Sequence, residues 1–191
     1  MEWAYRIDWQ ALAGFTNAGA IVVVAVIAGS KFDEWKKQFR YRRNAERAER
    51  ALLAFYEAEQ AIGEVRSPMS FAHESDRARE ELDAADPDRQ TIQAQIFFHR
   101  LFDRQEKWDA VVSELAPIRF GFGPDTSDAL REILKATRRI QVAAQMYPGT
   151  EDVEFRQKLE RDFWKINDQD ELSVRLIQAR EKLEKAFEEF T

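Results

Sequence analysis

The chain has 191 residues, of which 45% are hydrophobic and 34% are charged, and its formal net charge is −6 at pH 7. This length suits one domain of ordinary size with an added segment, and with 7 glycines and 5 prolines the composition favours long helices over strands and turns. The sequence contains no cysteine, which excludes disulfides, thiolate metal sites and a cysteine nucleophile.

The first predicted element is an uncharged, largely apolar segment, Ala11 to Gly29. As a helix it would measure ~28 Å, close to the ~30 Å thickness of the hydrocarbon layer of a bilayer. Aromatic side chains flank the segment, where lipid headgroups favour them; they are Trp3, Tyr5, Trp9, Phe32 and Trp35. The sequence therefore predicts a short extracytoplasmic terminus over 1–10 and a transmembrane helix over 11–30.

Basic side chains are concentrated directly after this segment. Residues 31–50 carry eight basic and four acidic side chains, whereas the rest of the chain is acidic. The positive-inside rule then places 31–191 in the cytoplasm. Basic residues beside a span contact anionic headgroups, and the candidates are Lys31, Lys36, Lys37, Arg40, Arg42 and Arg43. We expect a lipid bilayer as partner and no nucleic acid, because the acidic remainder repels phosphate.

Two other interpretations of Ala11 to Gly29 stay open. The first is a cleaved signal peptide, since Ala28-Gly29-Ser30 has suitably small residues, although the neutral to acidic N-terminus inverts the usual charge pattern. The second is a buried helix of a soluble domain, because the strongest apolar run, Ala18 to Ala28, is short for a span. An amphipathic surface helix is disfavoured, since the segment is apolar on every face.

No strong helix breaker lies between Gly29 and Arg66, so one helix is expected to continue out of the membrane. It should end at Arg66, because Pro68 disfavours helical geometry at Ser67. Its far half carries residues three and four apart, the pattern of a helix packed against others: Ala45, Ala48, Leu52, Phe55, Glu59 and Ile62. Glu59 is the charged member of this seam.

Two helices are predicted next. A short acidic one covers roughly Ser70 to Ala84, and Asp86-Pro87-Asp88 then combines a capping side chain with proline at a helix start. The following helix is expected to end at Pro117 and Gly121–Pro124. Its apolar face includes one charge, Arg104, and consists of Phe97, Leu101, Arg104, Trp108, Val111, Leu115 and Ile118.

The last two helices complete an all-α fold. Asp125, Thr126 or Ser127 is expected to cap a helix that ends near Met146, and Thr150–Asp152 opens a final long helix with a bend near Asp168–Asp170. Helices with short connections pack as antiparallel neighbours. The prediction is therefore an antiparallel cytoplasmic bundle of about four main helices over 31–191, continuous with the transmembrane helix.

The sequence contains none of the motifs that we sought for catalysis, cofactors or metals. The chain has two histidines, and the residues three before them are Ser70 and Ile96, so the Glu-x-x-His pairs of di-iron bundles are missing. Phosphate-cradling loops and Gly-x-Ser-x-Gly are missing too. Ser70 with His73 fits a helix cap followed by a surface histidine. We expect no catalytic residues, no cofactor, no metal and no enzymatic activity.

Glu59 and Arg104 form the candidate polar pair of the bundle core. Each is a charge within an otherwise apolar seam, on helices that we expect to be neighbours. A buried ion pair between them would fix the register of the helices at little net energy, because desolvation opposes the attraction. Two alternatives stay open: each side chain simply extends its charge to solvent, or the two line a polar pocket for a small ligand between the helices.

Four segments carry a resemblance to other proteins: Trp35–Gln38, Ala48–Ala58, Ala61-Ile62 and Arg66-Ser67-Pro68. They resemble the corresponding segments of a group of bacterial and prophage-type membrane-anchored helical proteins, for which no activity is known. The resemblance implies a membrane-anchored helical protein, and with the single span and the charge pattern we expect a single-pass protein of a bacterial inner membrane. We expect an interaction or scaffold protein whose bundle binds a protein partner or itself, the alternative being a membrane-tethered sensor or effector bundle that binds a small ligand.

Overall fold

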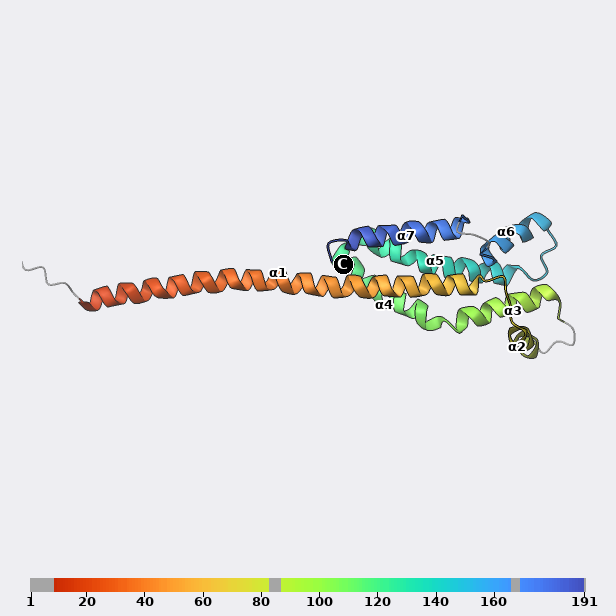
Figure 1. The fold of residues 1–191 in the computed structure, drawn as a ribbon, viewed down its shortest axis with the longest axis horizontal. Coiled ribbons are helices and arrows are strands. Elements are labelled where there is room, and N and C mark those ends of the chain that lie inside the picture. Colours follow the sequence, from red (N-terminus) through yellow and green to blue (C-terminus); the bar gives the residue numbers. More distant parts are fainter. Residues whose placement is uncertain (1–8, 83–86, 166–168, 191) are drawn as a thin grey trace, which may run out of the picture. The chain divides into compact units, whose positions relative to one another are not determined.

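The computed structural model describes residues 9–82, 87–165 and 169–190, and of residues 9–30 and 33 it describes the backbone alone. Within these residues the protein is all-helical, as predicted (Figure 1). The helices are α1 (Trp9–Val65), α2 (Ala72–Leu82), α3 (Arg89–Phe102), α4 (Gln105–Phe122), α5 (Pro124–Met146), α6 (Val153–Phe163) and α7 (Glu171–Phe187). The chain divides after Arg43 into two compact units.

Helix α1 is continuous across its 57 residues and ends directly before the predicted break at Arg66. Its part in the second unit buries one face, and the predicted seam residues Ala48, Phe55 and Ile62 are buried there. Alanines occupy much of the same face, with Ala51 and Ala58 fully buried. Small side chains allow neighbouring helices to approach closely, which explains how α1 forms one wall of the core.

Side-chain pairs show that α1 runs antiparallel to α4 and to α7, as the sequence predicts. Arg50 pairs with Glu114 of α4, whereas Glu64, further along α1, pairs with Arg104 just before α4 begins. Toward α7 the order is again reversed, because Tyr56 contacts Glu184 and Arg66 contacts Asp170. Helix α5 packs against α3, α4, α6 and α7 and completes the core of the bundle.

The helix predicted from Asp88 to Pro117 is two helices, α3 and α4, with a break at Asp103 and Arg104. The Trp108 indole N–H donates to the carbonyl of Leu101 at 3.0 Å and so replaces a helical partner that the break removes. Pro117 lies inside α4. Its missing N–H would have served the carbonyl of Ser113, which lies on an exposed residue where water can take the place of that donor.

The helix starts follow the sequence in part. Asp88 caps α3, accepting the N–H of Thr91 at 2.9 Å; Asp86 lies outside the described residues. Asp152 caps α6 as expected. The α5 caps predicted among residues 125–127 are wrong, because α5 already begins at Pro124 after Gly123, whose φ of +95° suits glycine. The predicted last helix, with its bend, is two helices in the structure: α6 ends at Phe163 and α7 begins at Glu171.

The predicted span, Ala11 to Gly29, lies within 9–30, where the side chains are outside the described residues. In the part of the chain that was searched for spans, no helix has the length and apolar character needed to cross a membrane.

Candidate functional site

Glu59 and Arg104, the candidate polar pair, do not pair with each other in the structure. Glu59 pairs with Arg180 of α7 at 3.2 Å, and Arg104 pairs with Glu64 of α1 at 2.9 Å. Glu64 lies five residues beyond Glu59, or ~7.5 Å along the helix, so Arg104 meets a later turn of α1. All four side chains are partly exposed. The two charges therefore belong to the rim of the core.

A cleft of about 690 Å³ does lie at Glu59, between α1 and α7, and Arg104 does not line it. Its polar groups are paired with each other or with neighbours. Tyr56 donates to Glu184 at 2.7 Å, and this hydrogen bond to a carboxylate raises the pKa of Tyr56. Because Glu59 is held by Arg180, the ligand pocket expected at Glu59 and Arg104 has few unpaired groups to offer.

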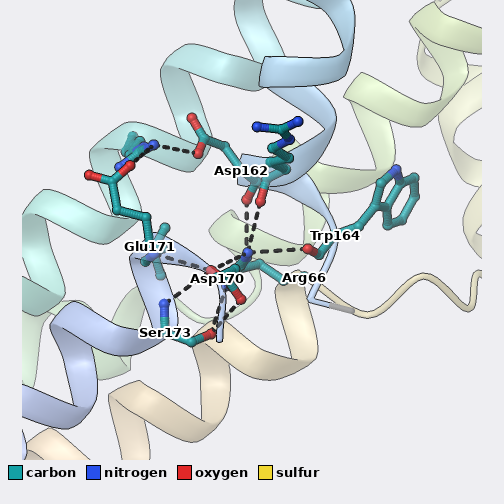
Figure 2. Close-up of polar contacts among 9 residues, drawn as sticks. Arg66, Asp162, Trp164, Asp170, Glu171 and Ser173 are labelled. Carbon is teal, nitrogen blue, oxygen red and sulfur yellow. Dashed lines mark hydrogen bonds and ion pairs between the residues drawn. The ribbon is translucent and has the colours of Figure 1, made fainter. Parts of the chain in front are cut away.

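Arg66, the first residue after α1, is completely buried and lies at the centre of a cluster of polar contacts (Figure 2). Its guanidinium donates to the carbonyls at the end of α6, namely those of Arg161 (2.9 Å), Asp162 (3.0 Å) and Trp164 (3.2 Å). It also donates to both carboxylate oxygens of Asp170, at 3.0 and 3.3 Å. We call this group the Arg66 cluster.

Asp170 serves two functions in the Arg66 cluster. One of its oxygens accepts the backbone N–H groups of Leu172 and Ser173 and so caps α7. Burial acts to raise the pKa of Asp170, but the hydrogen bonds from Ser173 and Arg66 outweigh it, and the pKa lies below its ordinary value. Arg66 thus closes the end of α6 and fixes the start of α7 with one side chain.

A second buried arginine, Arg100 of α3, closes the end of α1. It donates to the carbonyls of Val65 (3.2 Å), Ser67 (2.9 Å) and Met69 (2.6 Å). It also forms a two-pronged pair with Glu74 of α2, with both distances 2.8 Å. These hydrogen bonds from Arg100 hold the pKa of Glu74 at about 2. We call this group the Arg100 cluster.

A second cleft, of about 720 Å³, lies between α3 and α6, which Figure 1 shows at the same end of the bundle. We call it the α3–α6 cleft. Buried Ile96 and Phe97 and half-buried Trp164 supply its apolar surface. Its polar lining includes Arg89, Arg156 and Glu160, together with Tyr147, which donates to Glu160 at 3.0 Å.

In the first unit, α1 carries a row of exposed aromatic side chains. Phe32, Trp35 and Phe39 are 53%, 56% and 52% exposed, and successive rings stack with centroids 5.8 and 5.6 Å apart. We call this row the aromatic stripe. The six basic residues predicted to contact lipid are all exposed, and the ammonium group of Lys36 lies 4.3 Å from the centroid of the Phe32 ring.

The described side chains contain no cluster of three or more residues suited to hold a metal ion. His73 stacks on Phe71, and His99 is buried with its Nε2 at 2.6 Å from a carboxylate oxygen of Glu81. Comparison with protein-family models, curated proteins and solved structures finds no match for this chain. The residues themselves are therefore the basis for a functional proposal.

Sequence reasoning did not single out either arginine cluster. For Arg66 there was a usable signal, since the residue immediately precedes a Ser-Pro helix break, and Asp170 with Ser173 has the spacing of a helix cap. For Arg100 there was none, because a basic residue within an apolar helix face usually extends its charge to solvent.

Proposed function

We propose that this chain is a single-pass membrane-anchored interaction protein, with a span over 11–30 and a cytoplasmic helical bundle that binds a protein partner or a second copy. The observation that carries this proposal is the aromatic stripe between exposed basic residues. The stripe follows the uncharged segment directly in the sequence, at the position where headgroups would surround the helix.

The helical positions of these residues support contact with a membrane interface. At 100° per residue, Phe32, Trp35 and Phe39 lie within about 60° of one another around α1. Lys31 and Arg42 lie on one side of this stripe, and Lys36, Arg40 and Arg43 lie on the other. Aromatic rings favour the headgroup level, where neighbouring lysines and arginines gain about 1 kcal/mol each from anionic lipid.

The proposed interaction role is supported by an exposed apolar row on α4. Val112 and Phe120 are 51% and 92% exposed, and Ala116 lies between them at spacings of four residues, which places all three on one face. Phe120 is therefore a candidate anchor for a partner. Aromatic residues that become buried when two proteins bind supply much of the binding energy.

Membrane fractionation tests the anchor. The full-length protein is expected to sediment with membranes, to resist salt extraction and to dissolve in detergent. The double change Val23→Arg and Val24→Arg should shift it to the soluble fraction, because each arginine at the centre of a span costs about 3 kcal/mol on insertion scales. A soluble wild-type protein contradicts the proposal.

A matched control makes the same two substitutions in the bundle, at exposed positions Val142 and Val153. That variant should stay with the membrane. Topology is testable because the chain has no cysteine. Tyr5→Cys should react with an impermeant maleimide in intact cells with an opened outer barrier, and Val153→Cys should react after inner-membrane lysis; the reverse pattern overturns the orientation.

The interaction surface has its own test. Cross-linking in native membranes should yield a discrete adduct, either a dimer of the chain or a complex with another protein. Phe120→Ser should reduce that adduct, whereas Phe102→Ser, a change at a residue that is also highly exposed (73%) but lies on α3, should leave it unchanged. Equal yields from both variants would remove the α4 row from the proposal.

A further inference from the structure

The α3–α6 cleft combines unpaired positive charge with an apolar wall. We propose that it binds a small organic anion that carries a planar apolar group. This inference concerns the bundle alone and does not depend on the membrane anchor. The volume of the α3–α6 cleft, about 720 Å³, falls within the range of about 300–1,000 Å³ that is typical of small-ligand pockets.

Two guanidinium groups supply the charge. Arg89 is exposed and has no hydrogen-bond or ion-pair partner in the part of the chain that the structure describes. Arg156 donates Nε and Nη2 to the carbonyl of Thr150, at 3.1 and 2.6 Å, and pairs with no carboxylate among the described residues. Both arginines therefore keep N–H groups that a carboxylate, sulfonate or phosphate could accept.

The two arginines act on the same part of the cleft. Burial, and then the hydrogen bond to Glu160, raise the pKa of Tyr147, while Arg156 and Arg89 each act to lower it. Tyr147 stays protonated and donates to Glu160. Arg100 also lines the cleft, but its charge is matched by Glu74. Arg89 and Arg156 together exceed the single carboxylate of Glu160 by one positive charge.

The apolar wall is built of packed aromatic side chains. The Trp164 indole meets the Phe97 ring edge to face, with centroids 5.1 Å apart, and Phe97 stacks on Phe163 at 4.6 Å. The carbonyl of Trp164 accepts from Arg66, and Figure 2 shows the indole directed away from that contact. A planar group can lie against the partly exposed Trp164 side chain, so the cleft selects a ring and an acid in the same molecule.

Calorimetric titration of the full-length chain with 2-naphthoate tests the proposal, with a blank of the same buffer and any detergent. We expect saturable binding with one site per chain. Acetate carries the charge without the ring, and 2-naphthalenemethanol carries the ring without the charge, so each should bind at least tenfold more weakly. No binding of 2-naphthoate at millimolar concentration overturns the proposal. If 2-naphthalenemethanol binds as tightly as 2-naphthoate, the cleft does not recognise the negative charge and the proposed anion site is wrong.

Arg89→Gln is the decisive variant, because Arg89 forms no hydrogen bond or ion pair with a described residue and its loss should leave the fold intact. It should weaken 2-naphthoate binding about tenfold, as expected for the loss of one charge-assisted hydrogen bond. Arg156→Gln should do the same, with a melting curve to separate binding from stability. Arg138→Gln is the matched control, since Arg138 is exposed on α5, unpaired among the described residues and outside the cleft. Unchanged binding in Arg89→Gln, or equal loss in Arg138→Gln, contradicts the assignment.

Discussion

Charged side chains are partly exposed along the middle of the part of α1 that belongs to the second unit, but they are buried just beyond the end of α1. Along the middle, Glu57 pairs with Lys107 and Glu59 with Arg180, and these side chains are 21–45% exposed. Just beyond the end, the side chains of Arg66 and Arg100 are 1% and 6% exposed. The middle pairs form a rim around an alanine-rich core, whereas the two arginines replace backbone partners that broken helices leave open.

This difference in burial decides how much each group contributes to the free energy of unfolding. Exposed ion pairs contribute about 0–1 kcal/mol, because water solvates the separated charges well. Removal of an enclosed guanidinium leaves a carboxylate and several carbonyls without a partner, at a cost of about 3–5 kcal/mol. The interrupted ends of α1 and α6 therefore depend on one side chain each, and the uninterrupted middle of α1 depends on none.

The largest expected effect is that of Arg66→Met. Methionine fills much of the volume but donates no hydrogen bond, so Asp170 and the carbonyls at the end of α6 lose their partner. We expect the free energy of unfolding to fall by about 3–5 kcal/mol, a large part of the usual 5–15 kcal/mol of a domain. Urea denaturation followed by circular dichroism measures it.

Arg138→Met provides the reference for that experiment, since Arg138 is exposed and has no partner among the described residues. Its free energy of unfolding should stay within about 0.5 kcal/mol of the wild type. If Arg66→Met is equally mild, the distinction between enclosed and rim charges is wrong for this protein.

The next effect concerns Glu74 and the pH. Because Arg100 holds the pKa of Glu74 at about 2 in the folded protein, below its ordinary value of 4.5, the ionised carboxylate stabilises the fold above pH 4.5. That contribution, about 3 kcal/mol, is lost as the pH falls from 4.5 toward 2. Glu74→Gln should therefore be less stable than the wild type at pH 7.

Other carboxylates also titrate in this range, so the difference between the two proteins is the quantity to measure. Unfolding of the wild type and Glu74→Gln by urea at pH 7, 4 and 2.5 should show a stability gap that narrows as the pH falls. A gap that is the same at all three pH values would mean that the Arg100 cluster does not depend on the charge of Glu74.

The same comparison explains which features of the structure could be predicted from the sequence and which could not. Helical periodicity depends on neighbours three and four residues apart, so the faces of α1 that carry Phe55 and Ile62 could be predicted, as could the break before Pro68. The same pattern gives no information on which helix a face meets. Glu59 and Arg104 were each placed on apolar faces, but the rotation and level of the partner helix decided that they do not pair.

The Arg100 cluster could not be predicted from the sequence. Arg100 is buried because its guanidinium reaches carbonyls that are exposed only once α1 has ended and α2 has folded beside α3. Such partners are backbone atoms distant in sequence, and no residue type marks them. The α3–α6 cleft has the same origin, because its walls come from helices that the chain brings together only in the folded bundle.

The smallest expected effect is that of the rim pair Glu59–Arg180. It tests whether an exposed ion pair contributes as little to stability as the comparison requires. Glu59→Gln and Arg180→Gln, singly and together, form a double-mutant cycle whose coupling should be below about 1 kcal/mol. Both side chains keep access to water, at 21% and 34% exposure, so each finds a solvated alternative when its partner is removed. High salt should reduce the coupling further, whereas the loss in Arg66→Met should change little with salt. A coupling of 3 kcal/mol or more would place Glu59 with the enclosed charges and restore it as part of the core.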